Sequence, residues 1–250
     1  MKNLIFQYYI PYEANDTHLG GVEMPDWAKS GSRCAQKYAK LCGADYMLLH
    51  DRFFPDLDPR LDSSRIHYDS QFTKYDKILV LDLDMLITTR ENIFDIPIQD
   101  VAMVHEVGIH EKMSGWLRKV MNSPLEQRGI IAYGKKLFGD DWMFPKSTLY
   151  PLEKWRYMNG GLQLWSKEGR EKAKEHFTSL DDYVIYTRYT EQMYVNLQLT
   201  QPVFNVTELD NKWNRLPYQW VGRQPDGYIN HFLARNKFSM PELEKRGMCI

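Results

Sequence analysis

The stretch YDKILVLDLDMLI, residues 75–87, decides the fold of this chain. The continuous apolar run within 77–81 is typical of a strand that is covered on both faces. Asp82 and Asp84 follow it directly, and in an extended segment side chains two residues apart point the same way. Hard divalent cations take carboxylate ligands of this kind, so the pattern predicts a metal site. The alternative is that the two aspartates only cap a loop or a following helix.

Strands and helices alternate along the rest of the chain. We expect strands at 4–10, 45–49, 77–81, 101–104 and 161–165, and helices at 32–42, 63–74, 167–177 and 190–199. Gly43 is placed to end the first helix, and Thr190 to cap the last. This alternation predicts an α/β fold with a mostly parallel central sheet flanked by helices. In such sheets ligands bind beyond the carboxyl ends of the strands, where Asp82 and Asp84 are expected.

The composition limits the classes of protein. The chain has 250 residues, of which 43% are hydrophobic, and a formal net charge of −1. We expect one domain over residues 1–250, because the sequence shows no linker, repeat or low-complexity tract. The near-zero net charge argues against nonspecific nucleic-acid binding. No apolar run reaches the length of about 18 residues that a membrane-spanning helix needs. The three cysteines are typical of a reducing compartment, so we expect a cytoplasmic protein.

Five motifs in order resemble those of glycosyltransferase family 8, the group of glycogenin and the bacterial lipopolysaccharide galactosyltransferases. They are YDKILVLDLDMLI (75–87), MNGGLQLWS (158–166), TEQMYVN (190–196), LDNKWNRLP (209–217) and INHFLARNK (229–237). The resemblance implies the Rossmann-like GT-A fold, with the nucleotide-donor half mainly in 1–104. The acceptor half and a C-terminal metal and phosphate segment would lie mainly in 105–250. It also implies transfer of a hexose or similar sugar from a nucleotide-diphosphate sugar, with UDP as the favoured nucleotide, to a saccharide or other hydroxyl acceptor, with retention of configuration.

The resemblance also assigns the metal site. Asp82, Asp84 and His231 would hold the ion on the diphosphate, and Lys237 would meet the phosphates as a compact positive charge. Imidazole suits a transition-type ion, so Mn²⁺ is favoured, with Mg²⁺ as the alternative. A metal ion and a cation aimed at the leaving diphosphate stabilise the charge that develops there in the transition state.

The remaining site residues follow from the same resemblance. Gln192 would lie near the anomeric carbon, and Glu191 and Asn159 would bind sugar hydroxyls, which makes these three the candidate catalytic residues. The candidate donor-binding residues are the backbone at Gly160 and Gly161, Arg65 facing the sugar, and the end of the first strand at Gln7 and Tyr9 framing the base. Without a ligand, Asn159 and the glycines would only form a tight turn into a strand, and Glu191 would only suit the start of a helix.

The sequence departs from the family pattern at several of these positions. Gly160 stands where the family usually has Ala, and Glu191 where it has Asp. Ala234 replaces the Gly of the C-terminal signature, and Phe238 a following Pro. The longer Glu191 side chain is expected to change which sugar fits, and the phosphate-covering loop is expected to differ in shape.

The acceptor side is less defined by the sequence. We expect it between Val104 and Met158, where Trp116, Trp142 and Trp155 would suit a glycan, glycolipid or glycoprotein acceptor, although core packing explains such residues equally well. The amphipathic, basic segment 111–123 fits weak contact with an anionic membrane surface. The sequence does not indicate an oligomeric state.

Two other functions stay open. One is a nucleotidyltransferase that makes a sugar nucleotide, which is also an α/β, metal-dependent class. Such enzymes usually begin with a Gly-rich phosphate loop followed by Arg and Lys, and residues 6–21 lack one. The other is a noncatalytic carbohydrate-binding protein on the same fold. The intact pair of aspartates together with His231 argues against it.

Overall fold

The computed structural model describes residues 1–11, 23–106, 132–146, 148–149, 156–182, 190–217, 220 and 224–250. The expectations for Trp116, Trp155 and the segment 111–123 lie outside these residues. Trp142 is described, and its indole N–H donates to the Thr200 hydroxyl at 2.9 Å. Within the described ranges, every helix is too short or too polar to cross a bilayer.

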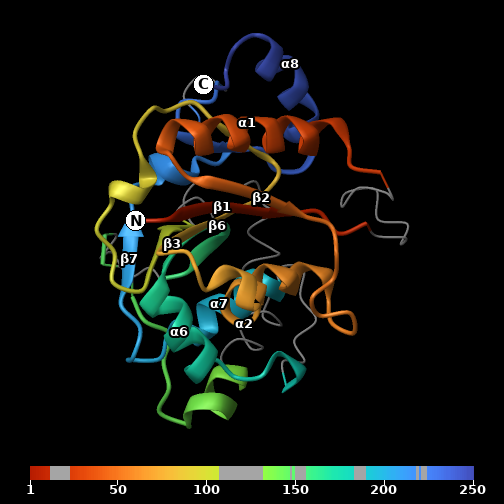
Figure 1. Cartoon of the computed structure of the whole chain (residues 1–250). Helices are drawn as coiled ribbons and strands as arrows, with labels where there is room; N and C mark the ends of the chain where they lie inside the picture. Colours follow the sequence, from red (N-terminus) through yellow and green to blue (C-terminus); the bar gives the residue numbers. More distant parts are fainter. Residues whose placement is uncertain are drawn as a thin grey trace.

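A six-stranded sheet forms the centre of the domain, in the order β2-β1-β3-β6-β5-β7 (Figure 1). Its strands are β1 (Asn3–Tyr8), β2 (Asp45–Leu49), β3 (Lys77–Leu81), β5 (Val101–His105), β6 (Met158–Ser166) and β7 (Val206–Leu209). β1 pairs in parallel with β2 and β3, and β5 pairs in parallel with β7. β6 runs antiparallel to both of its neighbours. The sheet is therefore mostly parallel, as expected, with one reversed strand in its middle.

Helices cover both faces of this sheet. α1 (Asp26–Cys42) and α8 (Met240–Lys245) lie on one face, and α2 (Arg65–Tyr68), α6 (Lys167–His176) and α7 (Thr190–Gln198) lie on the other (Figure 1). Ile78 and Val80 of β3 pack into the core on one side, and Leu79 and Leu81 into the core on the other. This arrangement confirms the prediction that the apolar run before Asp82 is covered on both faces.

A separate two-stranded sheet begins just after the end of β3. β4 (Met85–Ile87) pairs antiparallel with β8 (Ile229–His231). This β4–β8 ribbon brings a C-terminal segment beside the turn that carries the two aspartates. Sequence analysis did not predict either strand, because each is only three residues long.

Several predicted boundaries differ from the observed ones. The expected helix over 63–74 is wrong: α2 is a single turn between the 3₁₀ segments Pro59–Ser64 and Ser70–Phe72. The carboxylate of Asp69 accepts from the backbone N–H of Gln71, and this local bond starts a new turn instead of continuing the helix. β6 begins at Met158 rather than 161, so its glycines lie inside the strand.

The boundary predicted at Gly43 is confirmed. Gly43 takes a left-handed backbone conformation with φ 64° and ends α1. α1 begins at Asp26, six residues before the predicted start at Ser32, because the turn after Pro25 already has helical hydrogen bonding.

The observed pairing of cysteines does not support the reducing compartment that their number led us to expect. Cys34 in α1 and Cys249 near the C-terminus form a disulfide with a Cα–Cα distance of 5.6 Å, and Cys42 is free. Paired cysteines are typical of oxidising compartments rather than reducing ones. The cytoplasmic location therefore stays an expectation from the sequence alone.

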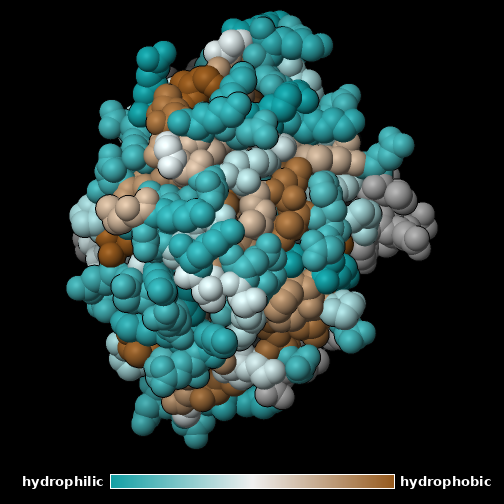
Figure 2. Space-filling view, in the orientation of Figure 1, coloured by the Kyte–Doolittle hydropathy of each residue, from teal (hydrophilic) through white to brown (hydrophobic). Residues whose placement is uncertain are grey.

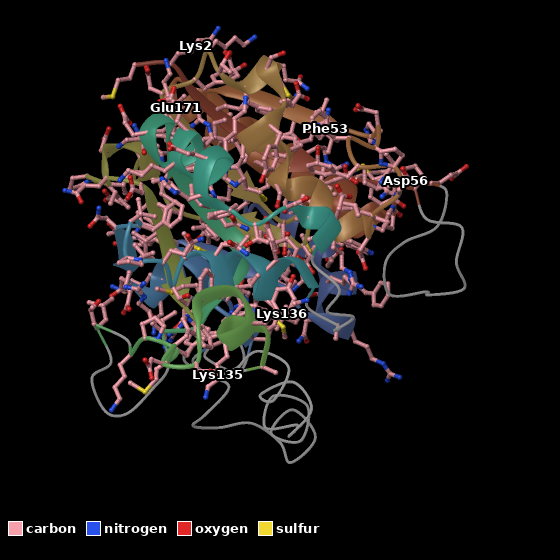
Figure 3. The ribbon with its side chains drawn as sticks, turned by 90° about the horizontal axis from the view of Figure 1, so that it is seen from below. Lys2, Phe53, Asp56, Lys135, Lys136 and Glu171 are labelled. Atoms are coloured by element: carbon pink, nitrogen blue, oxygen red, sulfur yellow. A yellow bond between two sulfur atoms is a disulfide. The ribbon has the colours of Figure 1, made fainter. Side chains whose placement is uncertain are left out.

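The surface in the view of Figure 2 is largely hydrophilic, with apolar side chains in separate patches. Exposed charges lie on several elements in the view from below. Examples are Lys135 and Lys136 on the helix over residues 132–138, and Glu171 on α6 (Figure 3).

Candidate metal and donor site

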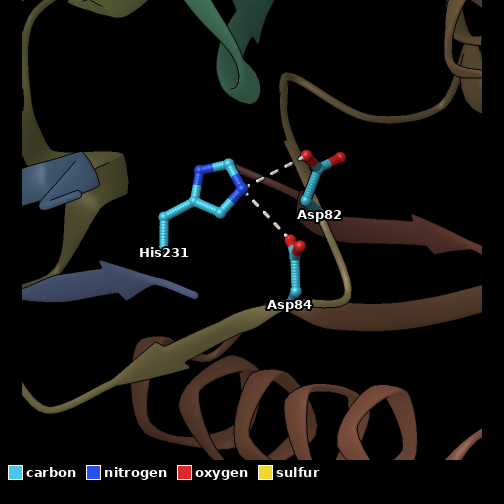
Figure 4. A group of neighbouring side chains, drawn as sticks. All are labelled: Asp82, Asp84 and His231. Atoms are coloured by element: carbon cyan, nitrogen blue, oxygen red, sulfur yellow. Dashed lines mark ion pairs between the residues drawn. The ribbon is translucent and has the colours of Figure 1, made fainter. Parts of the chain in front are cut away.

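The turn between β3 and β4 carries Asp82 and Asp84 at the carboxyl end of β3 (Figure 4). The segment is a turn rather than the extended strand that the sequence predicted. Two backbone hydrogen bonds fix it: Asp82 N–H donates to the Gly161 carbonyl at 2.8 Å, and Phe232 N–H donates to the Asp84 carbonyl at 2.7 Å. The two carboxylates still converge, because the turn is held from both sides.

His231 completes this group, as the resemblance implied. Pairing of Met85 with His231 across the β4–β8 ribbon sets the histidine beside the turn. Its Nε2 lies 3.1 Å from Asp84 Oδ1 and 3.7 Å from Asp82 Oδ2 (Figure 4). Ligand atoms of Asp82, Asp84 and His231 all lie within 4.8 Å of one another. We call these three residues the metal triad.

The electrostatics of the metal triad fit a cation site. Burial, followed by the charge of Asp84, raises the pKa of Asp82 to about 6. Burial acts to raise the pKa of Asp84 as well, but the charge and hydrogen bond of His231 outweigh it and hold that pKa below its ordinary value. For His231, burial opposes the charged form, yet the two carboxylates raise its pKa above the ordinary value. The two carboxylates thus favour a positive charge beside them, which is the kind of charge that a bound metal ion would supply.

Two glycines near the start of β6, Gly160 and Gly161, make room for the metal triad and for Glu191. A Cβ added at Gly161 would lie 2.7 Å from Asp82 Oδ2 and 2.7 Å from His231 Cε1. A Cβ at Gly160 would lie 2.7 Å from Glu191 Oε2. A methyl group at Gly161 would therefore crowd the metal triad, whereas one at Gly160 would displace the end of the Glu191 side chain.

The first turn of α7 lies over this end of β6. Gln192 accepts from the Gly160 N–H through Oε1 at 2.8 Å. Glu191 accepts from the Gln163 side-chain amide, and burial, followed by the charge of Asp82, raises the pKa of Glu191 to about 8. The Glu191 carboxylate fills the space that the missing side chain of Gly160 leaves open.

A cavity of ≈ 280 Å³ opens beside the two aspartates. Its lining includes Tyr9 and Lys237, both predicted as donor-binding residues, and Trp27 and Arg60, which were not predicted. The Lys237 ammonium lies 4.2 Å from the centroid of the Trp27 ring, within cation–π range. The cavity thus joins the metal triad to an aromatic, positively charged wall.

Two predicted donor-binding side chains are engaged elsewhere. Gln7 is fully buried, donates to the Asp82 carbonyl at 3.1 Å and accepts from the Tyr46 hydroxyl at 2.9 Å. The Arg65 guanidinium pairs with Asp51 and Asp69. Gln7 thus supports the backbone of the aspartate turn, whereas Arg65 links α2 to Asp51 in the segment that follows β2.

Sequence analysis missed two buried polar residues of the site. Glu106 directly follows β5, and its carboxylate accepts from the side-chain amides of Asn159 at 2.8 Å and Gln192 at 3.2 Å. Asn214 contacts His231 and Asn159. The position of Glu106, a charged residue at the carboxyl end of a predicted strand, was a usable signal. Asn214 lies inside the quoted motif 209–217, but nothing local marks it.

Comparison with solved structures shows the same fold. The chain matches a glycosyltransferase involved in the glycosylation of the major capsid of PBCV-1, with a TM-score of 0.56 and 11% identity, over 98% of this chain and 100% of the other. It matches mouse xyloside xylosyltransferase 1 with a TM-score of 0.54 and 13% identity, over 94% and 99%. It also matches the galactosyltransferase LgtC, solved with donor and acceptor sugar analogues, with a TM-score of 0.52 and 10% identity, over 98% and 99%.

Comparison by sequence does not assign the chain to a family. No protein-family model matches the chain, and no curated protein matches it. The low identities to the solved structures leave the resemblance to family 8 unconfirmed. What the structural matches do show is that this chain has the GT-A glycosyltransferase fold.

Proposed function

We propose that the chain is a metal-dependent glycosyltransferase that moves a hexose or similar sugar from a UDP-sugar to a hydroxyl of a saccharide acceptor. The observation that carries the proposal is the metal triad of Asp82, Asp84 and His231, because its two aspartates line a cavity of ≈ 280 Å³ together with Lys237. A sugar nucleotide needs both a site for its diphosphate and a hollow for its nucleoside, and the metal triad and the neighbouring cavity would serve these two needs.

The donor set of the metal triad fits a divalent cation. Two carboxylates and one imidazole converge, and this mixture favours Mn²⁺ over Mg²⁺. When bound, the ion would neutralise charge on the diphosphate leaving group. The protein would supply three ligands to the ion, and the donor diphosphate and water would supply the others.

The chain's own residues would act around that leaving group. Lys237 would place a positive charge near the phosphates, steadied by the Trp27 ring beneath it. Asn159, Glu191 and Gln192 would orient the sugar, because they surround the glycine-lined start of β6 next to the metal triad. Closely held polar groups at the reacting centre lower the entropic part of the barrier.

Retention of configuration and a glycan, glycolipid or glycoprotein acceptor also belong to this proposal. Both come from the resemblance of the motifs to family 8. The coupling constant of the anomeric proton at the new glycosidic linkage, read from an NMR spectrum of the product, would test retention directly.

A thermal-unfolding experiment tests the donor site. The protein is scanned with UDP, GDP, ADP, CMP and dTDP, each with Mn²⁺ and with a chelator. A ligand at 100 times its dissociation constant raises the free energy of unfolding by about 2.7 kcal/mol, which shifts Tm by several degrees for a chain of this size. We expect a Mn²⁺-dependent shift with UDP.

Two aspartate variants make the result specific. Asp84→Asn removes one ligand charge, and should abolish the Mn²⁺-dependent shift. Asp140→Asn changes an exposed carboxylate outside the site and should leave the shift intact.

Release of UDP from UDP-glucose and UDP-galactose is then followed with Mn²⁺. No shift with any nucleotide would contradict the donor site, and a shift without UDP release on any donor and acceptor tried would favour a binding protein on this fold.

A further inference from the structure

A chain of buried hydrogen bonds runs from Glu106 to the metal triad. The Glu106 carboxylate binds the Asn159 amide, the Asn159 carbonyl binds the Asn214 amide at 2.7 Å, and the Asn214 carbonyl faces His231 Nδ1 at 3.2 Å. The exposed fractions are 8% for Glu106, 5% for Asn159 and 1% for Asn214. A buried polar group that loses its partner is costly, so each member of this chain holds its neighbour in place.

The direction of the hydrogen bonds is set by groups that cannot reverse. The backbone N–H of Gly161 is always a donor, and it lies 3.0 Å from the side-chain oxygen of Asn159. The Asn159 nitrogen faces the Glu106 carboxylate at 2.8 Å. A carboxylate accepts and a backbone N–H donates, so the Asn159 side chain has one allowed orientation.

This orientation passes on to Asn214. The oxygen of Asn159 can pair only with the nitrogen of Asn214, so the oxygen of Asn214 is the atom turned toward His231. Nδ1 of His231 must therefore carry a hydrogen and donate it. The other ring nitrogen, Nε2, is the one directed at Asp82 and Asp84.

We infer that Asn214 is a positioning residue for the metal ligand His231. It holds the imidazole by Nδ1–H, so that the Nε2 lone pair is presented to the cation site, and Glu106 sets the direction of the whole chain. The Gln192 amide bonds the same Glu106 oxygen as Asn159, so the ligand and the candidate catalytic glutamine share one anchor. This inference rests on the proposed function, because it assumes that the metal triad binds a cation.

Loss of a partner that orients a metal-binding histidine typically weakens metal affinity 10–100-fold. The test measures the Kd for Mn²⁺ alone, by electron paramagnetic resonance of the free ion, on the full chain. Asn214→Leu removes the acceptor at similar size, and should weaken binding about 10–100-fold. Asn214→Ala serves as a second loss variant if the leucine protein does not fold.

A double-mutant cycle separates positioning from a merely structural role. If Asn214 acts through His231, then Asn214→Leu should cost no further affinity once His231 is replaced by alanine. A structural role would cost the same factor in both backgrounds. Circular dichroism and Tm of each variant confirm that the fold is retained.

The possible results are distinguishable. Weaker Mn²⁺ binding in Asn214→Leu or Asn214→Ala, with no further loss when His231 is already alanine, supports the inference. Wild-type affinity in the loss variants, or an equal loss in both backgrounds, overturns the inference and leaves the proposed function standing. A wild-type protein that binds no Mn²⁺ overturns both.

Discussion

A methyl group added at Gly161 should disable the metal triad by crowding two of its ligands at once. In Gly161→Ala the new Cβ would lie 2.7 Å from Asp82 Oδ2, 2.7 Å from His231 Cε1 and 2.8 Å from Met85 Cε. Comfortable contacts between such atoms begin near about 3.4 Å, so the neighbours must move by roughly 0.5 Å or more. Gly161 N–H and C=O are both hydrogen-bonded, which limits how far the strand itself can retreat.

The size of the effect follows from the tolerance of metal sites. Ligand distances hold within about 0.2 Å of their ideal values, which is less than the movement that the methyl group demands. We expect Mn²⁺ affinity to fall at least about 10-fold, in line with the loss of a ligand-orienting contact. Overpacking should also lower the free energy of unfolding by about 1–3 kcal/mol.

Gly160→Ala is the matched control. It adds the same group one residue earlier, but its Cβ meets Glu191 Oε2 at 2.7 Å and Gln192 Cβ at 3.0 Å instead of the metal triad. Isothermal titration with Mn²⁺ and thermal unfolding are measured on both variants. Undiminished Mn²⁺ affinity in Gly161→Ala, or an equal loss in both variants, would refute the steric argument.

Three further predictions concern stability. Ala234 has φ 49°, where the family signature carries glycine, so Ala234→Gly should raise the free energy of unfolding by up to about 1 kcal/mol in urea denaturation; a decrease would contradict a strained backbone there. The Cys34–Cys249 disulfide closes a sequence separation of 215, and reduction should lower that free energy by up to about 5 kcal/mol. A thiol assay in denaturant should find Cys42 alone before reduction, and three thiols from the start would exclude the disulfide. Burial raises the pKa of Glu191 from its ordinary value of 4.5 to about 8, so folding disfavours its ionised form. Wild-type stability in chelator should therefore fall from pH 4.5 to 8 relative to Glu191→Gln, and parallel pH profiles would contradict this.

The sequence by itself determined the central feature of this protein. The apolar run before Asp82 encodes a strand covered on both faces, since burial of one strand depends on its own residues. The helix end at Gly43 is equally local, because only glycine adopts that left-handed conformation at low cost. The aspartate pair was also visible, although its carboxylates converge through a turn and not through the predicted extended segment.

The helix predicted over 63–74 failed for a local reason that hydrophobic periodicity does not reveal. The side chain of Asp69 caps the 3₁₀ turn Ser70–Phe72, which ends the single helical turn Arg65–Tyr68 before it. A carboxylate that bonds a nearby backbone N–H competes with helix continuation, and the balance depends on what each turn packs against.

Only the tertiary structure shows how the residues around the aspartates come together. β6 runs antiparallel to β3 and β5, so its first residues, with Asn159, lie beside the carboxyl ends of both strands. Pairing of β4 with β8 sets His231 against Asp84. Hydrogen bonds through Asn159 then link Asn214, beside His231, to Glu106. Strand direction and long-range pairing are fixed by how the whole core closes, and no local pattern in the sequence carries that information.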